Sequence, residues 1–197
     1  MSFSSVLLLG SGCIGQNAVP QDYFYRLPTI HPKSPLHSTL INGAVAVDQF
    51  DADGVYRERP LLYVDAQRPL EVMQYHYRHW IQTPSQLVQE SVVDYLREAN
   101  IADSVERFSR GGRKDLLIKG RLQKFERLVQ ADRYFAVVEM EMQFRKKTPQ
   151  GTIEHIEKYK SQVSAHGPTI HDSVAAFGEA LQEIYDKMLN DLNYMSQ

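Results

Sequence analysis

The sequence contains a single cysteine, Cys13, among 197 residues. One cysteine excludes a disulfide within the chain, so the cysteine count does not indicate a redox compartment. An excess of charge is also lacking, because 22 Lys and Arg stand against 24 Asp and Glu, which gives a net charge of -2. Nucleic-acid-binding proteins usually carry a basic excess or a basic stripe, so we expect no nucleic-acid partner.

Long apolar runs are absent as well. No stretch of 18 or more apolar residues occurs, and the sequence therefore predicts no membrane-spanning helix. Any membrane attachment would have to come through the N-terminus. A hydrophobic content of 43% and a charged content of 23% are ordinary for a globular protein, and the length is sufficient for one hydrophobic core.

The region around Cys13 supports two incompatible interpretations. A G-x-G-x-x-G pattern at residues 10–15 follows an apolar run, which is the dinucleotide-binding fingerprint. That fingerprint needs a helix after the glycines and an acidic residue about 20 positions further on. Pro20 interrupts such a helix, and residues 29–37 contain no carboxylate. A nucleotide-binding cytoplasmic enzyme is therefore kept only as an alternative.

The second interpretation is a lipoprotein processing site. Residues 1–12 have the features of a signal segment, with a short apolar core that ends at Leu9 and small residues directly before Cys13. No Lys or Arg precedes Arg26, and Gly10 stands where bacterial lipoproteins usually have leucine. A start inside a longer signal would explain the missing basic residues. An incidental, buried cysteine is the remaining alternative.

The chain behind Cys13 predicts a tether followed by one domain. Residues 13–40 contain four prolines among polar residues, which indicates an extended tether with a short strand at residues 23–27. Residues 41–197 predict a single α+β domain, a largely antiparallel sheet with two main helices packed on it. The expected strands cover residues 41–50, 61–77 with a break at Pro69, 115–129, 134–144 and 153–163.

Two different signals predict the helices. Thr83, Pro84 and Gln86 supply an N-cap, a proline at the first helical position and a capping box, which predict a helix over residues 84–99. Apolar side chains recur every three or four positions over residues 174–192, which predicts a long amphipathic helix towards the C-terminus.

The clusters of functional side chains do not form a catalytic pattern. On a regular strand His76 and His79 face opposite sides, so they cannot chelate one metal without a bend. The adjacent residues His171, Asp172 and Ser173 lack a nucleophile-elbow context, and helix capping explains them more simply. We therefore expect a protein that is not an enzyme, with no metal and no cofactor.

Four segments together resemble a known family. They are the short signal that ends at Cys13, the sequence Tyr25-Arg26-Leu27-Pro28, the strand at residues 41–50, and the aromatic run at residues 75–80 that leads into the helix start at residues 83–88. These segments resemble the ABC-type transport auxiliary lipoprotein component family, which includes the paraquat-inducible protein C-like lipoproteins. The order of the later strands and the closing helix is similar too.

The resemblance implies a non-catalytic accessory subunit of an ABC system that moves lipids or other hydrophobic molecules across the Gram-negative envelope. Its partners would be a mammalian-cell-entry-domain protein, a permease and an ATPase. It further implies that Cys13 carries a diacylglycerol and an N-acyl chain after signal cleavage. Because Ile14 follows the cysteine in place of aspartate, we expect the periplasmic face of the outer membrane.

Some questions stay open at this point. Tyr75, Tyr77 and Trp80 are candidate partner contacts, provided that they are not part of the core. A structural envelope lipoprotein without a transporter is an alternative function, and a homo-oligomer is an open alternative to a monomer.

Overall fold

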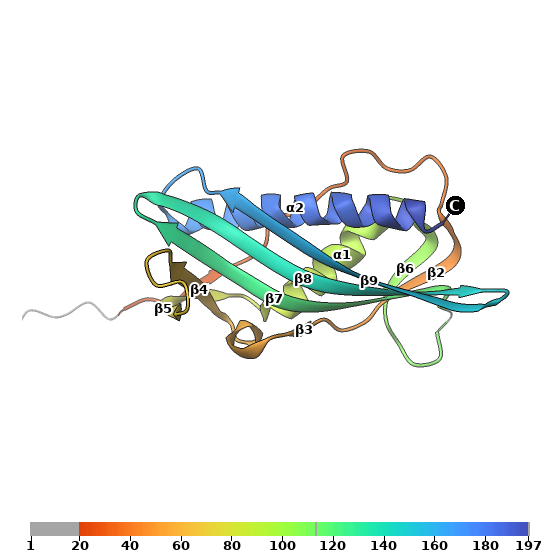
Figure 1. Cartoon of the computed structure of the whole chain (residues 1–197), viewed down its shortest axis with the longest axis horizontal. Helices are drawn as coiled ribbons and strands as arrows, with labels where there is room; N and C mark the ends of the chain where they lie inside the picture. Colours follow the sequence, from red (N-terminus) through yellow and green to blue (C-terminus); the bar gives the residue numbers. More distant parts are fainter. Residues whose placement is uncertain (1–19, 113, 197) are drawn as a thin grey trace, which may run out of the picture.

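The structure is a computed structural model that describes residues 20–112 and 114–196, so Cys13 and the predicted signal segment lie outside the described residues (Figure 1). The described residues form nine strands, two α-helices and one short 3₁₀ helix. In chain order these are β1 (Tyr23–Tyr25), β2 (Ile41–Val47), β3 (Asp51–Ala52), η1 (Gly54–Arg57), β4 (Pro60–Asp65), β5 (Val72–Trp80), α1 (Pro84–Glu98), β6 (Ala102–Arg107), β7 (Leu116–Gln130), β8 (Arg133–Thr148), β9 (Gly151–Ser164) and α2 (Ile170–Tyr194).

The strand β7 organises the sheet. Three short strands run parallel to successive stretches of it: β2 pairs with Leu116–Ile118, β3 with Arg121–Leu122 and β4 with Arg127–Val129. β6 is parallel to β2, and β1 is parallel to β5. The antiparallel pairs are β4 with β5, β7 with β8, and β8 with β9.

The sheet is therefore mixed, and it curls around the helices (Figure 1). Among the described strands five pairings are parallel and three are antiparallel, so the expected largely antiparallel sheet is wrong. Alternation of apolar residues fixes which face of a strand is buried, whereas strand order depends on contacts between distant segments. The single α+β domain and the antiparallel β7–β9 meander are confirmed.

Both predicted helices are confirmed. The α1 helix begins with the predicted capping box of Thr83 and Gln86. The α2 helix begins with a second capping box, in which Thr169 and Asp172 satisfy each other's backbone N–H groups. No helix in the described part of the chain has the length and the apolar run needed to cross a membrane.

The core lies between the curled sheet and the two helices. At its β5 end the side chains of Trp80, Phe125 and Phe177 join β5, β7 and α2. The Trp80 ring lies 5.3 Å from Phe125 and 5.4 Å from Phe177, and the two phenylalanine rings stack at 4.4 Å. Such aromatic pairs contribute beyond the area that they bury, so this cluster is a main source of stability at this end.

The described part of the predicted tether lies against the domain. Ile30 is buried, and Pro28 packs so close to Gly178 of α2 that a Cβ atom there would lie 2.9 Å from the proline ring. The Leu36 backbone N–H donates to the Ala99 carbonyl at the end of α1, at 3.0 Å. The boundary of the tether at residues 13–40 stays a prediction, but from Pro20 onward this segment contacts the domain.

Lys33 of this segment joins a polar cluster on the helices. Its Nζ lies 2.7 Å from Oδ2 of Asp186 in α2. The Tyr95 hydroxyl and the Gln182 amide each donate to the other oxygen, Oδ1, at 2.9 Å. Partial burial raises the pKa of Asp186, but the hydrogen bonds from Lys33, Tyr95 and Gln182 together lower it by more than burial raises it. The net pKa is therefore below its usual value. The carboxylate therefore stabilises the fold above the unfolded pKa of about 3.9, and this contribution is lost as pH falls through the folded pKa.

Replacing Asp186 with asparagine should lower the free energy of unfolding by about 1–2 kcal/mol near neutral pH, because charge-assisted hydrogen bonds are lost. The difference from the wild type should begin to shrink below about pH 4, where the carboxyl of the unfolded chain takes up a proton, and should be lost as pH falls through the lower pKa of the folded chain. Urea unfolding at about pH 7 and about pH 3 measures both values. Asp94→Asn, at a side chain that is 72% exposed, is the control and should have little effect. A difference that does not change with pH would contradict the prediction.

Candidate functional site

A bulge in β5 determines where its aromatic side chains point. Pro60 of β4 pairs with His79, but Leu62 pairs with Gln74, so residues 75–78 lie opposite Leu61 alone. Extra residues in one strand re-aim the side chains on either side of the bulge. Although a regular strand would place Tyr75 and Trp80 on opposite faces, both pack against the core here.

The three predicted contact residues of β5 have different environments. Trp80 is 1% exposed and belongs to the core, so its place among the candidate partner contacts is wrong. Tyr75 is half-buried, with its ring 4.5 Å from that of Tyr63. Tyr77 is 46% exposed and can contact a partner. Cys13, the predicted acylation site, lies outside the described residues.

β1 adds two further aromatic rings to this surface. Its pairing with β5 places Tyr23 beside Arg78 and Phe24 beside His79. The Arg78 guanidinium carbon lies 3.9 Å from the centre of the Tyr23 ring, which is a cation–π contact. Tyr23 is 45% exposed and Phe24 is 56% exposed, so large parts of both rings face solvent.

β1, β5 and the residues before β1 border a cleft of about 400 Å³, which we call the aromatic cleft. Its lining residues are Pro20, Gln21, Tyr23, Tyr75, His76, Tyr77 and Arg78. The proline, aromatic and arginine side chains of this lining provide apolar and cation–π contacts. Such a surface is suited to binding. The described residues contain no group of three or more His, Cys, Asp or Glu side chains that could hold a metal ion.

Arg127 holds Tyr75 at the back of the cleft. This arginine is 5% exposed, and it donates to the Tyr75 hydroxyl at 2.7 Å and to the Pro168 carbonyl at 2.5 Å. Its guanidinium also lies 4.0 Å from the centre of the Tyr134 ring. No sequence motif distinguishes Arg127 from the other charged residues of β7. It positions Tyr75 and does not reach the open face of the cleft.

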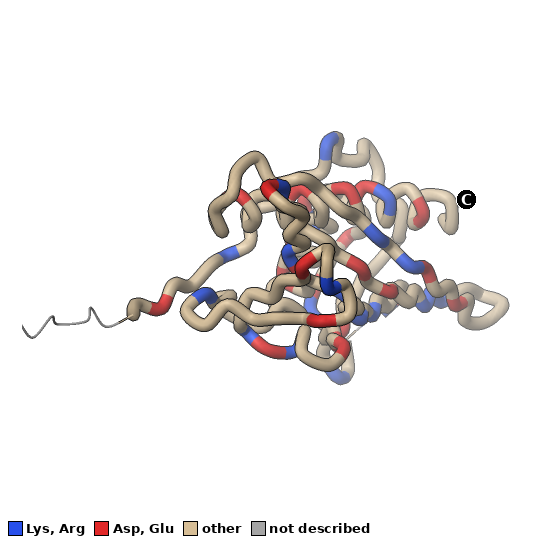
Figure 2. Tube along the Cα trace, turned by 60° about the vertical axis from the view of Figure 1, so that its left-hand side comes forward, with Lys and Arg blue, Asp and Glu red and all other residues tan. Residues whose placement is uncertain are grey.

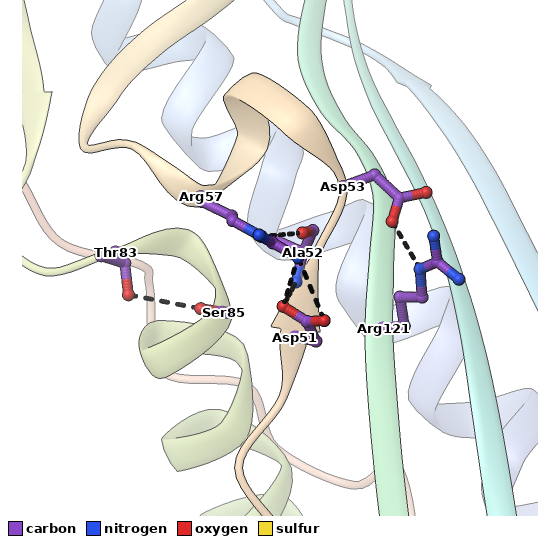
Figure 3. A network of polar contacts seen from close by, with 7 residues as sticks. All are labelled: Asp51, Ala52, Asp53, Arg57, Thr83, Ser85 and Arg121. Atoms are coloured by element: carbon purple, nitrogen blue, oxygen red, sulfur yellow. Dashed lines mark hydrogen bonds and ion pairs between the residues drawn. The ribbon is translucent and has the colours of Figure 1, made fainter.

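A second polar cluster lies at β3 and η1 (Figure 3). The Arg57 Nε donates to the Ala52 carbonyl at 2.6 Å, and its Nη2 lies 3.2 Å from Asp51. Arg121 of β7 pairs with Asp53 at 2.5 Å. The Arg57 contacts join η1 to β3, and the Arg121–Asp53 ion pair joins this segment to β7, so we assign the cluster a structural role. In the view of Figure 2, acidic and basic residues are interspersed along the described chain.

The fold is shared with solved structures of low sequence identity. No family model and no curated protein matches the sequence. The protein XCC0632 from Xanthomonas campestris, of the DUF330 family model, is 16% identical and superposes with a TM-score of 0.69 over 85% of this chain and 92% of its own. An uncharacterized protein is 10% identical, with a TM-score of 0.65 over 88% and 99%.

A third similar structure comes from another organism. The hypothetical protein CT253 from Chlamydia trachomatis is 6% identical, with a TM-score of 0.52 over 79% of this chain and 98% of its own. The superpositions establish a common fold, and sequence identities this low do not transfer an activity. The chain therefore has the α+β fold of the DUF330 protein XCC0632 over most of its length.

Proposed function

We propose that the protein is a non-catalytic auxiliary lipoprotein of an ABC-type transport system for lipids or other hydrophobic molecules. The observation that carries this proposal is the fold shared with a DUF330 protein over 85% of the chain. It supports the resemblance of the motifs around Cys13, residues 25–28 and residues 75–88 to the auxiliary lipoprotein family. In this proposal the protein binds its partners and performs no chemical step.

The start of the described chain agrees with an anchor at Cys13. Pro20 lines the aromatic cleft and lies three residues before the start of β1. The chain between Cys13 and Pro20 spans about 25 Å when it is fully extended. Two or more acyl chains give stable anchoring, whereas a single chain gives only marginal binding. Acylated Cys13 would therefore keep the cleft close to the periplasmic face of the outer membrane.

The proposed partners are a mammalian-cell-entry-domain protein and an ABC permease with its ATPase. Genes for these proteins next to the gene of this chain would support the proposal. If the neighbourhood contained none of them, a structural envelope lipoprotein without a transporter would be the better explanation.

Metabolic labelling with a fatty acid tests the anchor. We expect label on the wild type, expressed with its full native N-terminus, and no label on Cys13→Ala, because acylation requires the thiol. Immunoblots of the same samples provide the control, since both proteins should accumulate to similar amounts. Label that persists in Cys13→Ala would contradict the assignment, as would a wild type that never acquires label.

A further inference from the structure

We propose that the aromatic cleft is a membrane-contact surface, which lies against the headgroup region of the phospholipid bilayer that holds the anchor. This inference rests on the proposed acylation of Cys13 and adds an orientation to it. The end of the molecule with β1 and β5 faces the membrane, and the β8–β9 hairpin at the opposite end points away (Figure 1).

The first argument is the kind of side chain exposed at this end. Tyr23, Phe24 and Tyr77 are each about half exposed, on two neighbouring strands. Leu70, in the turn between β4 and β5, is 97% exposed. Exposed apolar side chains rimmed by polar ones mark interaction surfaces. Tyrosine in particular is enriched where an apolar ring meets the wet boundary of a bilayer.

The second argument is the charge that accompanies the rings. Arg78 stacks on Tyr23 and donates to the Tyr77 carbonyl at 3.2 Å, but within the described residues it forms no ion pair. The Arg59 guanidinium lies 5.3 Å from the centre of the Phe24 ring. Guanidinium groups bind phosphate oxygens well, and a long side chain can place its charge at headgroup level while its stem covers apolar surface.

The third argument is the place from which the anchor leaves. Pro20 and Gln21 themselves line the cleft, so the chain to Cys13 departs from the cleft itself. Because this link spans at most about 25 Å, acylation makes the contact between the cleft and the bilayer effectively intramolecular. A weak surface interaction is then sufficient to orient the domain. A protein partner at this surface would have to displace the bilayer that the anchor holds beside it.

A fluorescence experiment on the full chain tests the orientation without the anchor. The Cys13→Ala chain has no other cysteine, so one dye can be attached at Gln21→Cys in the cleft or at Gln150→Cys in the β8–β9 turn. Both glutamines are exposed. With vesicles of phosphatidylethanolamine and phosphatidylglycerol, an environment-sensitive dye should shift to the blue at position 21 and not at position 150. Equal shifts, or a shift only at position 150, would overturn the inference.

Paired variants of the same unacylated chain test the side chains. Tyr23→Asp with Tyr77→Asp should weaken partitioning into these vesicles at least about tenfold, because two rings lose their interfacial burial. Ile153→Asp with Ile156→Asp alters two residues of similar exposure in β9, and this control should change partitioning into the vesicles by less than about twofold. The predicted signal segment, residues 1–12, is identical in both chains, so it contributes equally to the measured binding.

Two results would overturn the inference: equal losses in the two double variants, or a cleft variant that keeps vesicle binding but no longer co-purifies with transport subunits. The second result would assign the cleft to a protein partner. Failure of the fatty-acid labelling is a separate outcome. It would refute the anchor, whereas vesicle binding by the unacylated chain is measured independently of it.

Discussion

Trp80→Ala should lower the free energy of unfolding by about 3–5 kcal/mol, the range for removing a large buried aromatic side chain. Trp80 is 1% exposed and touches Phe125 of β7 and Phe177 of α2, so its removal leaves a cavity between sheet and helix. The surrounding rings come from three separate elements and cannot all close the gap. Denaturant unfolding followed by far-ultraviolet circular dichroism measures the change, since the chain has no second tryptophan for fluorescence.

Tyr77→Ala is the matched control from the same strand. Its ring is 46% exposed, so the stability should change by no more than about 0.5 kcal/mol. The two substitutions therefore separate a core residue from a surface residue within the same aromatic run of the sequence. If they had similar effects on stability, the bulge in β5 and the burial of Trp80 would both be wrong.

Gly120→Ala should destabilise the protein by about 1–3 kcal/mol, although it adds only a methyl group. A Cβ atom at this position of β7 would lie 2.3 Å from the ring of Phe50, which is itself 2% exposed. The ring cannot rotate away into solvent, so the backbone or the core must shift. Denaturant unfolding of the purified variant measures the loss.

A double-mutant cycle with Phe50→Leu shows whether the contact is the cause. A smaller side chain at position 50 should leave room for the added methyl group, so the double variant should be more stable than the sum of the single effects predicts. Strict additivity would show that Gly120 is required for another reason. The period-two pattern of the sequence predicts the strand around Gly120, but it does not show which ring approaches it.

The elements that the sequence predicts well are specified by local signals. Both helices have capping residues and an apolar stripe within their own segments, and the long β7–β9 strands alternate clearly around short turns. β6 was not predicted, because Ala102 and Val105 are its only buried residues and no alternation results. The parallel alignment of β2, β3 and β4 along β7 depends on distant contacts, for which the sequence carries no local signal.

The site was only partly predictable for the same reason. The aromatic run of β5 is conspicuous, but its bulge reverses the alternation, so the burial of Trp80 could not be derived from its spacing to Tyr75. Tyr23 and Arg78 are far apart in the chain and meet only through the pairing of β1 with β5. Arg127 is visible only in the structure, because its hydrogen-bond partners come from β5 and the loop before α2.

Affinity purification from detergent-solubilised envelopes of the native bacterium tests the proposed function most directly. The tagged full-length chain, expressed at its native level, should enrich a mammalian-cell-entry-domain protein and an ABC permease over an untagged control strain. Quantitative mass spectrometry of the two eluates gives the enrichment. Recovery of the tagged chain with neither of these proteins, although both are present in the same solubilised envelopes, would contradict the role as a transport auxiliary subunit.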